Sequence, residues 1–238
     1  AMLYSPEGFR HHQARSNLLS GFYYGIVAIM CLYNLLIFFS IRDRSYLYYV
    51  LYLASFGLLI LLRNGLGLQW LWPDAPWWNH HAQPVLHWLT MGLSTLFAIH
   101  FLGLPENNPR LARFLRGMSA TALIVAPLTL THFDLGLRLG SFLLLPWTLV
   151  IMGVAASRVM QGFVSARYFL LAYSAVALVS VLFWLRTLGL LNQAEWLEYA
   201  LQGATALEAL LLSFALAHRM TVLKQENERI QRQANEEL

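Results

Sequence analysis

The sequence predicts an all-α integral membrane protein, a bundle of seven transmembrane helices with its N-terminus outside the cytoplasm and its C-terminus inside. Three observations predict this class: little charge, seven long apolar runs and an uneven distribution of arginines. Only 12% of the 238 residues are charged and 58% are apolar or aromatic, whereas a soluble domain carries about 25% charged residues. Such a chain has too few polar side chains to cover its surface in water.

The apolar runs approach the length of helix that crosses a bilayer. About 20 helical residues span ~30 Å of hydrocarbon. The first run is too long for the core of a signal peptide and ends without an A-x-A-like cleavage site, so we expect it to be a true span. In chain order the runs are Leu18–Ser40, Tyr46–Leu62, Val85–Leu104, Gly117–Phe133, Ser141–Ala156, Tyr168–Leu185 and Leu201–Ala217.

The positions of the positive charges predict the orientation. Cytoplasmic segments of membrane proteins carry an excess of Lys and Arg. With the N-terminus outside, eleven basic residues fall on the inner side and five on the outer side. The outer segment after the second run, WLWPDAPWW at residues 70–78, holds four tryptophans, which is typical of an aromatic belt at the lipid headgroups. The inner residues are Arg42, Arg44, Arg110, Arg113, Arg116, Arg158, Arg167, Arg219, Lys224, Arg229 and Arg232, and the outer ones are Arg10, Arg15, Arg63, Arg138 and Arg186.

A short polar segment, Arg42-Asp43-Arg44-Ser45, separates the first two runs. The chain must therefore turn back tightly at the cytoplasmic surface. Arg42 and Arg44 are expected to anchor this turn in the positively charged inner layer. Asp43 is expected to cap the second helix or to pair with an arginine, and Ser45 is a further candidate for the N-cap.

A few polar side chains interrupt the apolar runs and are the candidate ligand-binding residues. Glu208 is the only carboxylate deep in a span, and Thr205 lies one turn before it. An ionised side chain inside the bilayer is costly, which makes it a default functional candidate. In the third run His87, Thr90 and Ser94 follow at spacings of three and four, so they share a helical face. The alternative for both groups is interhelical hydrogen bonding that fixes the packing.

The segment after the last run, residues 218–238, is predicted to continue as a cytoplasmic helix. It has no Gly or Pro and consists mostly of good helix formers. Leu223 and Ile230 stand seven residues apart, and Asn227 and Ala234 follow each of them by four, which gives a thin heptad seam. We interpret this seam as a signalling helix in a parallel homodimer. The alternative is a solvated helical stub.

Several classes of function are disfavoured. The net charge of +4 is spread along the chain, so we expect no nucleic-acid partner. A retinal photoreceptor needs a lysine within the membrane, and the single lysine is Lys224 in the tail. Ser94 and His87 lie about 10 Å apart along one helix, too far for nucleophile activation. We therefore expect no catalysis by these residues themselves, no metal and no cofactor. A small-molecule or proton-coupled transporter remains the alternative function, because Glu208 or the His87 face suits a proton or a substrate.

One stretch resembles a known family. GFYYGIVAIMCLYNLLIFFSIRDRSYLYYVLY, residues 21–52, resembles the opening of the bacterial seven-transmembrane receptors with diverse intracellular signalling modules. The shared features are the Gly21-x-Tyr23-x-Gly25 start, the Leu32-Tyr33-Asn34 segment in mid-span and the Arg42-to-Leu47 turn. The preceding segment, FRHHQARSNLL at residues 9–19, resembles the lead into that membrane domain.

The resemblance implies a receptor that relays a periplasmic or membrane signal to a cytoplasmic effector of the histidine kinase or cyclic-di-GMP type. It implies a periplasmic sensor domain and a cytoplasmic output domain in the same full-length chain, in the bacterial inner membrane. On this basis we divide the chain into a periplasmic lead-in segment (1–17), a seven-transmembrane receptor domain (18–217) and a cytoplasmic helical linker (218–238) toward an absent output domain.

Overall fold

The computed structural model describes the backbone of residues 6–191 and 196–236, and the side chains of residues 17–191, 196–222, 225 and 231. Within these limits the chain forms helices joined by short turns. In order they are α1 (Pro6–Ile41), α2 (Arg44–Arg63), the π-helix η1 (Gly67–Leu71), α3 (Pro76–Phe101), α4 (Leu104–Asn107), α5 (Pro109–Leu128), α6 (Phe133–Met160), α7 (Ser165–Thr187) and α8 (Trp196–Glu236).

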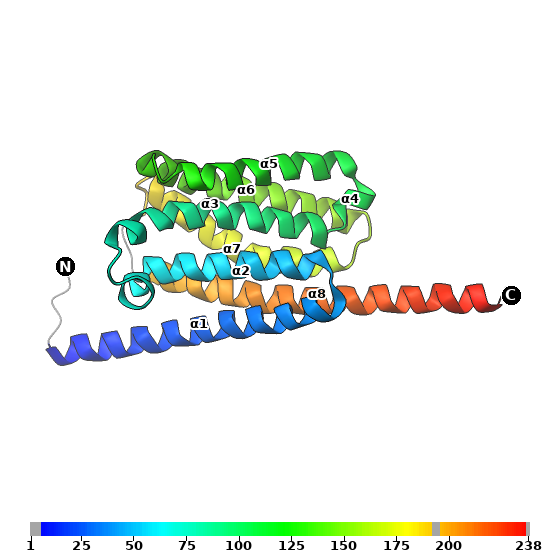
Figure 1. Cartoon of the computed structure of the whole chain (residues 1–238), viewed down its shortest axis with the longest axis horizontal. Helices are drawn as coiled ribbons and strands as arrows, with labels where there is room; N and C mark the ends of the chain where they lie inside the picture. Colours follow the sequence, from blue (N-terminus) through cyan, green and yellow to red (C-terminus); the bar gives the residue numbers. More distant parts are fainter. Residues whose placement is uncertain (1–5, 192–195, 237–238) are drawn as a thin grey trace.

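Seven of the described helices, namely α1 to α3 and α5 to α8, are long and apolar enough to cross a membrane. This confirms the predicted all-α class with seven spans. The helices lie side by side with their axes roughly aligned (Figure 1). We call the end of the bundle at which α1, α3, α6 and α8 begin the N-terminal end, and the end at which α2, α5 and α7 begin the C-terminal end.

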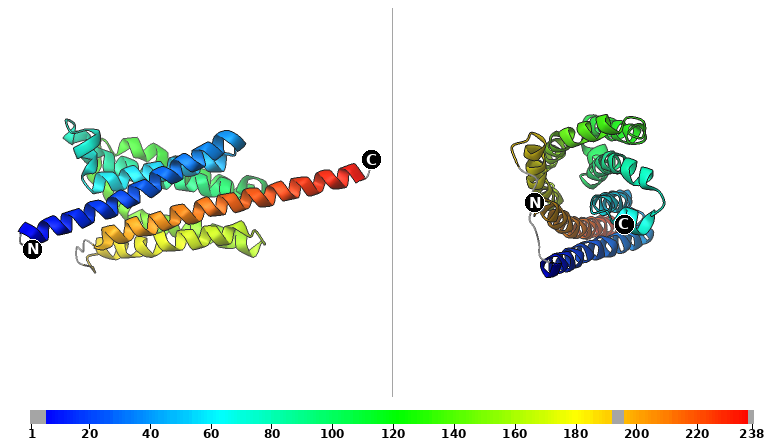
Figure 2. Two further views of the ribbon diagram at one scale, coloured as in Figure 1. Left: turned by 90° about the horizontal axis from the view of Figure 1, so that it is seen from below. Right: turned by 90° about the vertical axis from the view of Figure 1, so that its left-hand side faces the viewer.

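The outer faces of the bundle are apolar, as expected for a protein that has lipid as its solvent. On α1, the side chains of Leu18, Phe22, Leu36 and Phe39 are each 60% exposed or more. Exposure of so large an apolar area to water is rare in soluble proteins. Viewed along the bundle, α1 lies at its edge (Figure 2, right), which leaves this apolar face free to contact acyl chains.

Aromatic rings fill the centre of the bundle. Tyr49 of α2 lies 5.3 Å from Phe97 of α3, ring centroid to centroid, and Phe97 and Phe101 both contact Phe169 of α7. Phe169 in turn stacks on Tyr173 at 4.3 Å. All five rings are buried. Aromatic pairs at these separations stabilise a core beyond the area that they bury, so this cluster fixes α2, α3 and α7 against one another.

The predicted turn between the first two spans is present at the C-terminal end. Its backbone reverses at Arg42, which has a positive φ of 60°. Asp43 is the N-cap of α2 and its carboxylate accepts a hydrogen bond from the backbone N–H of Ser45 at 2.8 Å, so the predicted capping by Asp43 is confirmed. Ser45 lies inside the helix, and its candidacy as the N-cap was wrong. A carboxylate placed before the helix also interacts favourably with the helix dipole, which a hydroxyl does less well.

All seven spans start earlier than the apolar runs suggested, and three of them start eight or nine residues earlier. The third begins at Pro76, the fourth at Pro109 and the fifth at Phe133, whereas the runs begin at Val85, Gly117 and Ser141. The predicted end of the fourth span at Phe133 was wrong, because α5 ends at Leu128 and Phe133 is the first residue of α6. Proline is favoured in the first turn of a helix because its φ is already helical, and Asn108 caps the fourth span by accepting from the backbone N–H of Leu111. Counting apolar residues misses polar first turns of this kind.

The last helix continues well past the bundle. α8 has 41 residues, or about 60 Å at 1.5 Å per residue, which is about twice the ~30 Å of the hydrocarbon layer. Figure 1 shows its final turns beyond the C-terminal end of the bundle. The backbone of the predicted linker is thus helical through Glu236. The side chains of the predicted heptad seam, Leu223, Asn227, Ile230 and Ala234, lie outside the described residues.

Candidate functional site

A ladder of three tyrosines joins α2 to α8. Tyr46, Tyr49 and Tyr52 stand three residues apart, so they share one face of α2. The hydroxyls of Tyr46 and Tyr49 donate to the backbone carbonyls of Leu216 and Ala209 at 3.2 and 2.6 Å. All three tyrosines are buried. Their spacing was visible in the sequence, but the partners were not, because they lie on the last helix.

The third tyrosine binds the carboxyl group of Glu208. The hydroxyl oxygen of Tyr52 lies 2.8 and 3.0 Å from the two carboxyl oxygens, and Glu208 is only 2% exposed. Polar groups buried in hydrocarbon must be hydrogen-bonded to avoid a cost of several kcal/mol each. Tyr52 therefore supplies the hydrogen bond that Glu208 needs. The Tyr52 hydroxyl donates to an ionised carboxyl group, and either group can donate to the other when the carboxyl group is protonated.

The first helix makes polar contacts with the same face of α8. The side-chain amide of Asn34 donates to the hydroxyl of Ser213 at 3.0 Å and to the Met30 carbonyl at 2.9 Å. Thr205 donates to the Leu201 carbonyl at 2.8 Å, and its hydroxyl lies 3.5 Å from that of Tyr23. The predicted residue Thr205 is thus part of the α1–α8 contact.

At the C-terminal end, Arg219 connects α8 to the first turn of α2 and to its N-cap. Its guanidinium donates to the Ser45 hydroxyl at 2.7 Å and lies 3.8 Å from the carboxylate of Asp43. It also lies over the Phe101 ring at 5.8 Å. Two of the predicted turn residues therefore contact the helix that leaves the bundle. Together with the tyrosine ladder, these bonds extend along α8 from Glu208 to Arg219, and we call them the α2–α8 seam.

A cavity lies between the helices near the N-terminal end, and two predicted residues line it. Its volume is about 90 Å³, and its walls come from α2, α3, α6, α7 and α8. His87 and Thr90 face it together with hydroxyl groups of Ser141, Ser180 and Thr187. A site of this size holds more than one water, whose share of liquid volume is about 30 Å³.

The five predicted ligand-binding residues fall into two groups. His87 and Thr90 line the cavity, and Thr90 also donates to the Ser55 hydroxyl at 3.1 Å. Ser94 turns back to the Met91 carbonyl of its own helix. Thr205 and Glu208 belong to the contacts of α8 with α1 and α2 described above. The sequence suggested that all five residues bind a ligand. In the structure only two of them line a cavity, and Thr205 and Glu208 form contacts between helices.

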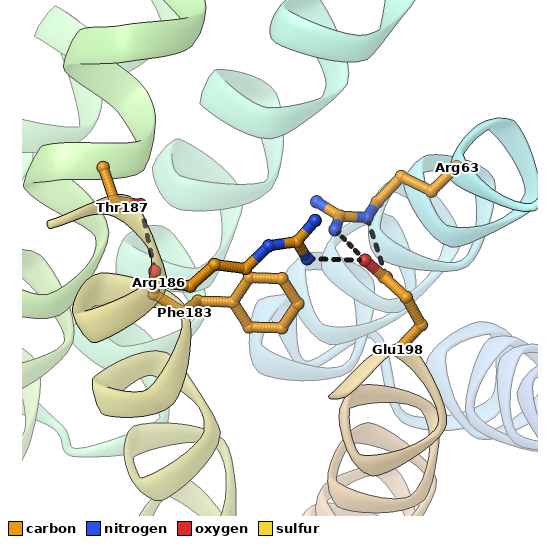
Figure 3. A network of polar contacts seen from close by, with 5 residues as sticks. All are labelled: Arg63, Phe183, Arg186, Thr187 and Glu198. Carbon is orange, nitrogen blue, oxygen red and sulfur yellow. Dashed lines mark hydrogen bonds and ion pairs between the residues drawn. The ribbon is translucent and has the colours of Figure 1, made fainter. Parts of the chain in front are cut away.

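Sequence reasoning missed a charged cluster at the rim of this cavity. Arg63, at the end of α2, forms a bidentate ion pair with Glu198 of α8: Nη2 lies 2.6 Å from Oε1 and Nε lies 3.2 Å from Oε2. Arg186 of α7 approaches the same Oε1 at 3.4 Å. Phe183 lies beside both arginines (Figure 3), and the centroid of its ring is 5.0 Å from the guanidinium carbon of Arg63 and 5.9 Å from that of Arg186. The only available signal was that all three charges flank ends of spans.

The comparisons with known proteins agree with this architecture. No curated protein and no solved structure shows significant similarity to the chain. A protein family described as 7TM diverse intracellular signalling matches residues 16–219. The match covers most of the chain and includes the seven spans, the α2–α8 seam and the cavity. The chain therefore belongs to the 7TM diverse intracellular signalling family.

Proposed function

We propose that this chain is the receptor part of a signalling protein and relays a stimulus from the N-terminal end of the bundle to a cytoplasmic effector through α8. Membership of the family supports a membrane sensor domain associated with signalling. The proposal adds the direction, with the N-terminal end facing the periplasm of a bacterial inner membrane. It also adds the effector class, a histidine kinase or an enzyme of cyclic-di-GMP metabolism in the same full-length chain.

The observation that carries the proposal is the continuity of α8. One uninterrupted helix lines the cavity through Leu201, forms the α2–α8 seam from Glu208 to Arg219, and then runs past the bundle. A change in packing at the cavity therefore reaches the tail as a rotation or shift of one rigid rod. Packed helices change between discrete arrangements rather than deforming smoothly, which suits a two-state output.

The proposed mechanism is a shift between two packings of α8. A stimulus moves the equilibrium only if it binds one packing more tightly than the other. In the packing described here, α8 is held against α2 by the tyrosine ladder. The second packing would exchange or lose some of these bonds, and the exposed tail would pair differently with the tail of a second copy in a homodimer. In this proposal the membrane part performs no catalysis.

The experiment tests the phase of α8, by which we mean the rotation of its tail about the helix axis. A diguanylate cyclase fused after Leu238 is expressed with one, two, three or four alanines inserted after Val222, and cyclic-di-GMP is measured in cells. Each inserted residue rotates the following helix by about 100°, so output should rise and fall with insertion length and return near the fourth insertion. Matched insertions after Gly162, in the α6–α7 turn, should leave output unchanged.

Two results would contradict the proposal. Output that is the same for all four insertions would show that α8 carries no rotational signal. Output that varies with insertions after Gly162 as strongly as with insertions after Val222 would show that any insertion disturbs the bundle. Solute or proton uptake by vesicles containing the chain, with no phase dependence of output, would favour the alternative of small-molecule or proton-coupled transport.

A further inference from the structure

Among the described side chains, the rim of the cavity near the N-terminal end carries two arginines and one carboxylate. Arg63 and Arg186 share a single carboxylate, that of Glu198, so the described side chains of this cluster leave one positive charge uncompensated. Arg63 itself lines the cavity, as does Thr187, the neighbour of Arg186. Among the described groups, the second arginine makes the rim attractive to an anion.

The two guanidinium groups have N–H donors to spare. Arg63 gives two nitrogens to Glu198 and Arg186 gives one, and a guanidinium carries more N–H groups than this. Phe183 restricts both groups from one side by cation–π contact. Their side chains remain 23% and 28% exposed. The free donors are thus held in place and accessible, as in sites that bind carboxylates bidentately.

The interior of the cavity is chemically different from its rim. Below the arginines, apolar side chains such as Leu59, Leu144 and Val176 line most of the wall. The polar groups between them are the ring of His87 and the hydroxyls of Thr90, Ser141, Ser180 and Thr187. Nε2 of His87 is buried and makes no hydrogen bond to any described residue. The lining therefore suits an occupant with a charged head and a short, mainly apolar body that passes a few hydroxyl groups.

We propose that this cavity binds a short organic carboxylate, with its carboxylate group at Arg63 and Arg186 and its apolar chain between α2, α6 and α7. This inference rests on the proposed receptor function and names the class of ligand that the receptor senses. An inorganic anion has no apolar part to contact the apolar walls. A cation would be repelled by the excess positive charge of the described rim residues. The volume of about 90 Å³ fits a short chain rather than a membrane lipid.

Binding is measured on the whole chain in zwitterionic lipid nanodiscs by isothermal titration calorimetry. The probe is hexanoate, with the isosteric neutral hexanamide as the control ligand and empty nanodiscs to subtract partition into lipid. We expect saturable hexanoate binding and at least tenfold weaker binding of hexanamide, because charge-assisted hydrogen bonds to arginine are lost. Equal binding of the two ligands, or no saturable hexanoate binding, would overturn the proposal.

Three variants locate the site. Arg186→Gln removes one guanidinium while keeping the Arg63–Glu198 pair, and should weaken hexanoate binding about tenfold. Arg138→Gln removes an exposed arginine of α6 at the same end of the bundle, and should leave the affinity unchanged. Ser180→Leu fills the cavity without touching the arginines, and should abolish binding. Equal affinities for Arg186→Gln and Arg138→Gln would place the ligand elsewhere.

The outcome separates this inference from the proposed function. If the cyclase fusion depends on the phase of α8 but hexanoate does not bind, the ligand class is wrong and the relay stands. If hexanoate binds at this cavity but neither hexanoate nor insertions in α8 change output, the site is real and the relay is refuted.

Discussion

The contact between Tyr52 and Glu208 leads to a prediction about stability that can be worked out from the structure. Tyr52→Phe removes the hydroxyl that lies 2.8 and 3.0 Å from the two carboxyl oxygens of Glu208. The ring stays in place, so the main change is a buried carboxyl group without its partner. Leaving a buried polar group unsatisfied costs about 1–3 kcal/mol in proteins, and hydrogen bonds between membrane helices are worth about 0.6–1.7 kcal/mol. We therefore expect Tyr52→Phe to lower the free energy of unfolding by about 1–2 kcal/mol.

A matched control is available in the same bundle. Tyr173 is also a buried tyrosine, and its hydroxyl makes no hydrogen bond to a described residue. Tyr173→Phe removes the same atom from a buried hydroxyl that lacks such a bond, so the change should be neutral or stabilising. Reversible unfolding of both variants in mixed detergent micelles, followed by circular dichroism, gives the two free energies.

A double-mutant cycle tests the pairing itself. Glu208→Leu replaces the carboxyl group by an apolar side chain of similar size, and combining it with Tyr52→Phe removes both partners. Replacing both partners costs much less than leaving one of them buried without a hydrogen bond. The loss in free energy of unfolding of the double variant should therefore be about 1 kcal/mol smaller than the sum of the losses of the two single variants. If the effects of Tyr52→Phe and Tyr173→Phe are equal, or if the cycle shows simple additivity, the hydrogen bond does not stabilise the α2–α8 contact.

Two further predictions concern the turn and the cavity. Asp43→Ala should destabilise the protein by about 1 kcal/mol because the backbone N–H of Ser45 loses its cap, whereas Asp43→Asn keeps an acceptor and should cost a few tenths; equal losses in the same unfolding assay would argue against capping. Gly140→Ala places a methyl group 2.7 Å from the His87 ring, whereas Gly153→Ala on the same helix meets nothing within 4 Å. Gly153→Ala should stabilise α6 by about 1 kcal/mol through helix propensity, and Gly140→Ala should lose that gain or more to overpacking. Equal stability of the two glycine variants would show that the His87 ring moves away from the added methyl group without a cost in free energy.

The candidate site was only partly predictable. Glu208 stood out because a carboxylate in an apolar run is costly wherever the helix lies. His87 and Thr90 were grouped correctly because residues three apart share a helical face. Tyr52 and Glu198 were not singled out. Nothing local to Tyr52 distinguishes it from an interfacial tyrosine, and Glu198 looks like an ordinary charge at the end of a span.

What the sequence determined by itself is the number of spans, the tight turn at Asp43 and the helical tail. These depend on local properties: apolar length, capping side chains and helix propensity act within a few residues of the chain. Only the tertiary structure decided which faces meet. Tyr52 and Glu208 are 156 residues apart, and the charges of Arg63, Arg186 and Glu198 come from three helices. A helical pattern identifies the polar face of each helix, but the order and rotation of the packed helices determine the partner of that face.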